Sequence, residues 1–305
     1  MKIDSMWDGE AITLPSSVIG SFVKILDSND LLQKAKGPRP KKGPVGGVSK
    51  DATDEHFCQS YDGSLARTAL VYLNPKGELQ EAAETLRRYL MGGKLCLIDL
   101  PAGAGAGAIS LLGCIAQLRE LEELPRQPLE VLIIWPEIST FAVEYGMNLL
   151  ADLEPYFNSQ AITVKVRSKV WDILDDVSNT ELIEEIVRAK SQYSQLLMVA
   201  CNFSGFLGRD EKWKKANANL SSVFKFCSGD MNAAIWIEPN TRLVRNKFFE
   251  TLDGFFAKLP SFARFFLTKK FESSEARFNS PTISTLSPRV NAFVLPIELV
   301  KETSR

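Results

Sequence analysis

The stretch Leu97-Ile-Asp-Leu-Pro-Ala-Gly-Ala-Gly-Ala-Gly-Ala-Ile-Ser-Leu111 decides the fold. An apolar run ends in Asp99, glycines then follow at every second position, and a helical pattern of apolar residues begins. Glycine lets the backbone turn tightly and approach a ligand with no Cβ in the way. The helix that follows presents free N–H groups and a positive dipole end. We therefore expect a strand, a glycine-rich turn and a helix that bind a ligand; the alternative is a turn of small residues that only helps packing.

From residue 95 onward, predicted strands and helical stretches alternate along the chain. The predicted strands are 95–100, 129–135, 161–166, 195–201, 233–238, 264–267 and 290–296, and the predicted helices between them are 108–121, 140–153, 179–190, 212–227 and 245–259. Buried strands that alternate with helices predict βαβ units and a parallel sheet. Ligands in such sheets lie outside the carboxyl ends of the strands, where the strand order reverses. The residues expected there are 99–107, 136–139, 171–172, 202–206 and 238–241.

The expected fold is a Rossmann-like, seven-stranded, mostly parallel α/β sheet with helices on both faces and a small helical N-terminal extension. The sequence predicts three parts: an N-terminal extension at 1–50, a helical front segment at 51–94 and the Rossmann-like domain at 95–305. The extension contains a flexible linker at 33–47 that is rich in proline, glycine and basic residues and has no acid. It is either a solvated linker or a basic arm that contacts phosphate groups.

Composition narrows the function classes. The chain has 305 residues and a formal net charge of −1, so no overall field attracts nucleic acid. Its five cysteines form no CxxC pair, which argues against a disulfide framework and a zinc site, and we expect no metal. No apolar stretch is long enough for a membrane helix, so we expect a soluble, cytoplasmic protein. The single histidine, His56, is either a general base or an ordinary surface or cap residue.

A second motif follows the second predicted strand, in Ile134-Trp-Pro-Glu-Ile-Ser139. An acidic residue at the end of that strand can accept hydrogen bonds from both hydroxyls of a ribose. The combination of this acid with the glycine-rich turn is more specific than either motif alone.

The pair Asp99-x-x-x-Gly103-x-Gly105 and Glu137-Ile138-Ser139 resembles the first two motifs of class I S-adenosylmethionine (SAM) methyltransferases. The resemblance covers the chain from about residue 95 onward. It implies that SAM is the cofactor and that Glu137 binds its ribose, with Ile138 beside it. It also implies that the methionine half of SAM lies against the first motif, formed by Asp99, Pro101, Ala102, Gly103 and Gly105. The family usually has glycine where this chain has Pro101, which fixes φ and removes an N–H.

The same resemblance assigns two further strand ends. Trp171 and Asp172 follow the third strand, where the family holds the adenine. Asn202 and Phe203 follow the fourth strand, where the methyl group meets its acceptor, and are the expected catalytic residues. The signature of amino-methylating enzymes, an acid or asparagine followed by two prolines and an aromatic residue, is absent. DNA adenine and exocyclic cytosine methylation are therefore disfavoured.

Two other segments resemble the ribosomal small-subunit methyltransferase-like family: residues 59–73 and Ile235-Trp-Ile-Glu-Pro-Asn-Thr241. The C-terminal cysteine cluster of that family is missing. In the first segment, Tyr61 and Arg67 either line the mouth of a substrate site or belong to an ordinary polar helix face.

The sequence thus favours a SAM-dependent methyltransferase with an unidentified acceptor such as RNA or protein. The alternative is a catalytically inactive methyltransferase-like fold that acts as a subunit or scaffold. A nicotinamide dehydrogenase is disfavoured because no matching catalytic constellation follows the glycine-rich turn. A nucleic acid or protein partner is expected and a membrane is not. The phenylalanines and basic residues between 248 and 270 form either core or a partner surface.

Overall fold

A computed structural model describes residues 5–38, 47–209, 212–241, 271–282 and 288–299. The described residues form an α/β fold around one mixed sheet of eight strands in the order β1-β7-β8-β6-β5-β2-β3-β4. The strands are β1 (Ala11–Ile12), β2 (Gly93–Leu100), β3 (Leu129–Glu137), β4 (Ile162–Val170), β5 (Gln195–Cys201), β6 (Asn232–Glu238), β7 (Glu272–Phe278) and β8 (Arg289–Glu298).

Five neighbouring strands, in the order β4-β3-β2-β5-β6, are parallel. The chain runs outward from β2 to β4 and then returns to β5 on the other side of β2, so the order reverses between β2 and β5. Ligands in doubly wound sheets bind outside the carboxyl ends of the strands at such a reversal. The strand β8 is antiparallel to both β6 and β7, which makes the sheet mixed.

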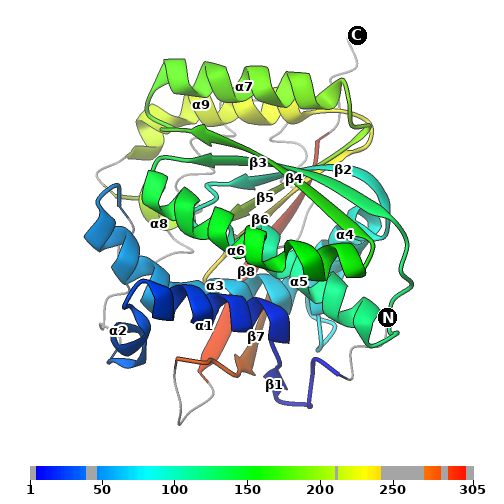
Figure 1. The fold of residues 1–305 in the computed structure, drawn as a ribbon. Helices are drawn as coiled ribbons and strands as arrows, with labels where there is room; N and C mark the ends of the chain where they lie inside the picture. The colour runs from blue at the N-terminus through cyan, green and yellow to red at the C-terminus, as the bar shows by residue number, and fades with distance from the viewer. Residues whose placement is uncertain (1–4, 39–46, 210–211, 242–270, 283–287, 300–305) are drawn as a thin grey trace.

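Helices cover both faces of the sheet (Figure 1). One face carries α7 (Asp176–Lys190) and α9 (Lys212–Cys227). The opposite face carries α1 (Ser16–Ser28), α3 (Lys50–Leu73), α4 (Gln80–Leu90), α5 (Ala106–Glu120) and α6 (Thr140–Ser159). Two short helices, α2 (Leu32–Lys36) and α8 (Ser204–Leu207), lie in the connections.

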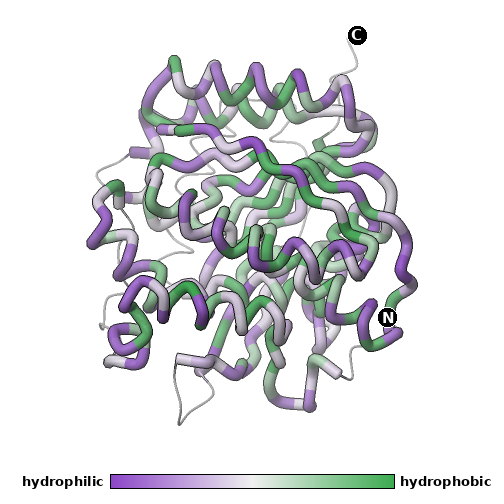
Figure 2. Tube along the Cα trace, in the orientation of Figure 1, coloured by the Kyte–Doolittle hydropathy of each residue, from purple (hydrophilic) through white to green (hydrophobic). Residues whose placement is uncertain are grey.

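The central strands are apolar on both sides because both faces are covered. In β2, Leu95 and Leu97 join the core under α3 and α5, whereas Cys96 and Ile98 join the core under α7 and α9. Figure 2 shows the hydrophobic positions concentrated along these strands. By the same alternation, Asp99 at the end of β2 lies on the α5 side, next to the first turn of that helix.

The described part of the N-terminal extension packs against the sheet and its helices. Strand β1 pairs with β7 in the sheet, and α1 packs against α5 and α6. A Cβ at Gly113 of α5 would lie 2.5 Å from Cγ2 of Val18, so α1 approaches α5 closely. Helix α3 packs along α5, and its first half reaches α6.

The sheet has eight described strands rather than the seven predicted, and the prediction missed β1 and β7. Strand β1 has only two residues, and β7 (Glu-Ser-Ser-Glu-Ala-Arg-Phe) is mostly polar. The predicted flexible linker at 33–47 was wrong at its start, because 33–36 belong to α2 and Ala35 is fully buried. The predicted helix at 245–259, the predicted strand at 264–267 and the phenylalanine-rich, basic region lie outside the described residues.

Within the described part of the chain, no helix combines the length and the apolar character that a membrane crossing requires.

Candidate functional site

The glycine-rich turn between β2 and α5 uses its glycines in different ways. Gly103 and Gly105 have positive φ angles of 54° and 76°. A Cβ at Gly105 would lie 1.9 Å from Cη2 of Trp135, so the indole ring fills that space. A Cβ at Gly103 would meet nothing within 4 Å. Gly103 is therefore the glycine of the turn that leaves space for a ligand.

Asp99 supports the turn from below. Its Oδ2 accepts a hydrogen bond of 2.8 Å from the backbone N–H of Ala108 in the first turn of α5. Its Oδ1 faces Gly107, where a Cβ would be 2.7 Å away, and has no hydrogen-bond partner among the described residues. Burial raises the pKa of Asp99 to about 7; the bond from Ala108 opposes this shift, and the nearby Glu137 carboxyl adds to it.

Glu137, at the end of β3, joins two segments of the sheet edge. Its Oε2 accepts a 2.8 Å bond from the N–H of Gly103, and its Oε1 accepts a 2.9 Å bond from the N–H of Ser139. Burial raises the pKa of Glu137, although these backbone donors favour its charged form. Each carboxylate oxygen has two lone pairs, so acceptor capacity remains.

The same edge is tied to α3 through hydroxyl groups. The Ser139 hydroxyl accepts the N–H of Ala142 as the N-cap of α6 and lies 2.8 Å from the Thr53 hydroxyl. Thr53 in turn donates to the carbonyl of Gly47. This chain of bonds fixes the start of α3 beside the start of α6.

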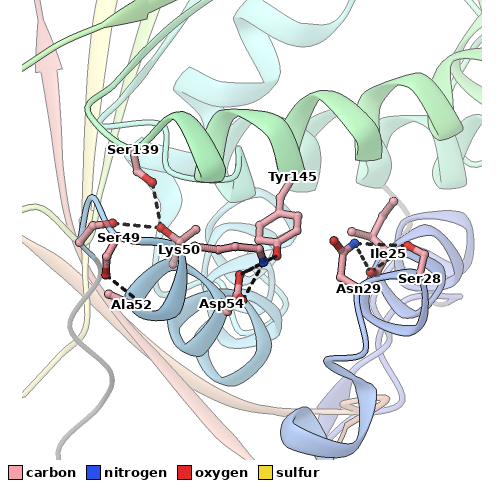
Figure 3. Close-up of polar contacts among 11 residues, drawn as sticks. Ile25, Ser28, Asn29, Ser49, Lys50, Ala52, Asp54, Ser139 and Tyr145 are labelled. Atoms are coloured by element: carbon pink, nitrogen blue, oxygen red, sulfur yellow. Dashed lines mark hydrogen bonds and ion pairs between the residues drawn. The ribbon is translucent and has the colours of Figure 1, made fainter.

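A second contact joins the first turns of α3 to Tyr145 in the second turn of α6 (Figure 3). The Lys50 ammonium donates to Asp54 at 2.8 Å and to the Tyr145 hydroxyl at 3.2 Å. Tyr145 donates to Asp54 at 2.6 Å, and its ring stacks on Phe57 at 4.5 Å. Asp54 and then Tyr145 raise the pKa of Lys50, so this ammonium stays charged.

Asn202, directly after β5, is held by two side chains of α3. Arg67 donates from Nη1 to Asn202 Oδ1 at 2.6 Å, and Asn202 Nδ2 donates to the Ser64 hydroxyl at 3.2 Å. The Asn202 backbone has φ of 57°, a left-handed conformation that asparagine tolerates better than most residues. Strained backbone of this kind clusters at functional sites.

Phe203 is held by Glu238 and Trp236 of β6, on the α7 and α9 face of the sheet. Oε1 of Glu238, at the end of β6, accepts bonds from the N–H groups of Phe203 and Ser204, from the Ser204 hydroxyl and from Trp236 Nε1. Burial raises the pKa of Glu238, and these donors oppose the shift. The Phe203 ring is buried and stacks on Trp236, so its side chain supports the loop from below.

The structure places the predicted adenine-side residues in less accessible positions than Ile138. Trp171 is buried, and its Nε1 donates to Asn179 of α7. The Asp172 carboxylate accepts the N–H of Leu174 in the following turn. Ile138 is 40% exposed and Val170, at the end of β4, is 61% exposed, which gives this edge an apolar surface.

Of the remaining predicted residues, Pro101 is partly buried and Ala102 is buried, with its N–H bonded to the carbonyl of Pro136. Tyr61 is buried against Phe22 and Phe57, and its hydroxyl has no partner among the described residues. Burial raises the pKa of Tyr61, and the Asp99 carboxyl adds to the shift. His56 is partly buried on α3, and burial lowers its pKa.

Sequence reasoning missed Thr53, Ser64 and Trp135, which help to build the site. It placed Ser139 and Glu238 at the strand ends but assigned neither its hydrogen-bonding role. The capping role of Ser139 could have been predicted, because serine between a strand and an apolar helix pattern is a typical N-cap. The pairs Thr53–Ser139 and Ser64–Asn202 join residues far apart in the chain, and the sequence carries no local signal for them.

The residues present fit an adenosyl cofactor. The open space at Gly103, the exposed apolar side chain of Ile138 and the remaining acceptor capacity of Glu137 lie at neighbouring strand ends. These supply a close approach to the backbone, an apolar contact for a base and acceptors for hydroxyls.

No protein-family model matches the chain, and no curated protein matches it. Among solved structures, the chain is similar to a protein of Methanococcus maripaludis provisionally described as an S-adenosyl-L-methionine-dependent methyltransferase. The identity is 12%, the TM-score is 0.35, and the match covers 88% of this chain and 100% of that one. A likeness at this level carries no functional argument.

The two left-handed glycines of the turn should respond differently to alanine. Gly103→Ala adds only the cost of a left-handed alanine, on the order of 1 kcal/mol of unfolding free energy. Gly105→Ala adds the same cost and forces its Cβ into Trp135, which should destabilise the protein by about 2 kcal/mol more. Urea unfolding of both variants measures the difference; equal losses would contradict the packing of Trp135 beneath the turn.

Asp99 should make stability depend on pH. Its pKa is about 7 in the folded protein and 3.8 as the unperturbed value, so the unfolded chain loses the proton first as pH rises. The free energy of unfolding should therefore fall between about pH 4 and pH 7. Between pH 5 and pH 7.5 the wild type should lose on the order of 3 kcal/mol relative to Asp99→Asn.

Asn at position 99 keeps an oxygen that accepts from Ala108, so the variant isolates the titration. Glu238 titrates in both proteins and cancels in the comparison, whereas Glu137 is coupled to Asp99 and its change belongs to the measured difference. Parallel stability–pH profiles for wild type and Asp99→Asn would refute the assignment.

Proposed function

We propose that this protein is a SAM-dependent methyltransferase whose acceptor, such as RNA or protein, is unidentified. The observation that carries the proposal is the convergence of Gly103, Glu137 and Asn202 at the strand-order reversal between β2 and β5. The mixed sheet of eight described strands with helices around it is consistent with a Rossmann-like methyltransferase fold. One fold hosts many functions, so the site residues carry the proposal.

The cofactor would lie across the ends of β2 and β3. Gly103 offers the close backbone approach, Ile138 offers an apolar face for the adenine, and Glu137 offers its remaining lone pairs to the ribose hydroxyls. The start of α5 presents backbone N–H groups on the same side. Roles of Trp171 and Asp172 at the adenine remain predictions.

When bound, SAM supplies an electrophilic methyl group on a sulfonium. The task of the chain is then to orient the acceptor and to exclude water. Asn202 has no basic group, and both ends of its amide are engaged by Arg67 and Ser64, so it orders the loop after β5. Phe203 supports that loop from the opposite face through its contact with Trp236. Both residues are thus proposed to shape the acceptor side.

Calorimetric titration with SAM and S-adenosylhomocysteine, with NADH as a control, tests the cofactor. We expect micromolar binding of both SAM ligands and none of NADH. Ile138→Asp should weaken binding about 10-fold or more, because a charged group replaces the apolar contact for the adenine. Val187→Asp is the matched control, since Val187 is 49% exposed on α7 and lies in its later turns.

If folded protein bound neither SAM ligand, the methyltransferase proposal would be wrong. The catalytically inactive scaffold would then be the better hypothesis. Equal weakening by Ile138→Asp and Val187→Asp would instead place the cofactor away from Ile138.

A further inference from the structure

The guanidinium of Arg67, on α3, lies beside Asn202 at the end of β5, where the strand order reverses. Its Nε donates to the carbonyl of Asn291 in β8 at 3.0 Å, and its Nη1 donates to Asn202 Oδ1 at 2.6 Å. These two bonds connect α3 to the strand end of β5 and to β8. Because two of its nitrogens are fixed, the plane of the guanidinium is fixed as well.

The rest of the guanidinium has donors to spare. A guanidinium has five N–H groups, and no described residue accepts a bond from Nη2 of Arg67. The side chain is partly exposed, yet enclosed deeply enough that burial lowers its pKa, while the Glu238 carboxyl opposes that shift. A preorganised, partly desolvated arginine with unused donors is suited to a carboxylate.

The carboxyl groups and the arginine at this edge are complementary in charge to the amino-acid end of SAM. The described edge carries the carboxyl groups of Asp99, Glu137 and Glu238. SAM carries two cationic groups, its sulfonium and its ammonium, and one carboxylate. The carboxylate needs a cation, and Arg67 provides one next to Asn202. Lys50, near the start of α6, is already held by Asp54 and Tyr145.

We propose that Arg67 binds the carboxylate of the amino-acid end of the cofactor while it holds Asn202 in place. The proposal rests on the function proposed above and assigns a subsite to a helix outside the glycine-rich motif. Arg67 then has two roles: it orders the loop after β5 through Asn202, and it binds the carboxylate of the cofactor.

A thermodynamic cycle on ligand and protein tests the proposal. The two ligands are S-adenosylhomocysteine and its decarboxylated analogue, which keeps the adenosine, the sulfur and the ammonium. The variants are Arg67→Met and, as a matched control, Arg87→Met; Arg87 bonds the carbonyls of Tyr72 and Leu73 at the far end of α3. Affinities come from calorimetry, and thermal melting confirms that each protein is folded.

Loss of the ligand carboxylate should weaken binding to wild type and to Arg87→Met about 10- to 100-fold. The same loss should change the affinity of Arg67→Met by no more than about 2-fold. A purely structural role of Arg67 would weaken both ligands equally and keep the carboxylate preference, which would overturn the proposal. Wild type with no carboxylate preference would overturn it too.

If Arg67→Met does not fold, Arg67→Lys replaces it. Lysine keeps the charge but cannot hold Asn202 and Asn291 with one planar fork, so the carboxylate preference should fall at least 5-fold from the wild-type value. An unchanged preference would overturn the proposal. Failure of wild type to bind S-adenosylhomocysteine at all would be a failure of the proposed function, and thus a distinct result.

Discussion

The candidate site depends on the two hydrogen bonds that the Glu137 carboxylate accepts from backbone N–H groups. One oxygen accepts the N–H of Gly103 and the other accepts the N–H of Ser139, so a single side chain sets the glycine-rich turn against the start of α6. The Ser139 hydroxyl is hydrogen-bonded to the Thr53 hydroxyl, which links this contact to the start of α3. Helix α3 then returns to the sheet edge at Arg67, which holds Asn202. The edge of the sheet is thus fixed by a continuous set of polar contacts.

This arrangement brings three buried carboxyl groups to one edge of the sheet, where burial disfavours their charged forms. Burial raises the pKa of Asp99, Glu137 and Glu238, and each is stabilised in its charged form by backbone or side-chain donors. Oδ1 of Asp99 and Oε2 of Glu238 are enclosed without a hydrogen-bond partner among the described residues. Buried carboxyl groups with shifted pKa values at one strand edge are typical of a functional site, since packing alone would favour apolar residues there. The left-handed Asn202 adds backbone strain at the same place.

The central part of the fold could be predicted from sequence because its signals are local. Apolar runs predicted β2, β3, β5, β6 and β8, and an alternation of apolar and polar residues predicted β4. The glycine-rich turn was placed correctly between β2 and α5. The polar β7 and the two-residue β1 give no such signal, since they form by pairing with distant strands. The site was predicted only as a set of strand ends. Gly105 leaves the space that the Trp135 ring fills. Thr53, Ser64 and Glu238 act through contacts between residues that are distant in the sequence.

The proposed cofactor site is the sheet edge formed by Gly103, Glu137 and Asn202, which we expect to bind an adenosyl group. The most direct measurement is a titration of 15N-labelled protein with S-adenosylhomocysteine, followed through the backbone amide resonances. Cofactor binding at this edge should produce saturable shifts at the amides of Gly103, Ile138, Ser139 and Asn202, with little change in α7 and α9. Unchanged resonances at that edge in folded protein, or shifts confined to the helices of the other face, would contradict it.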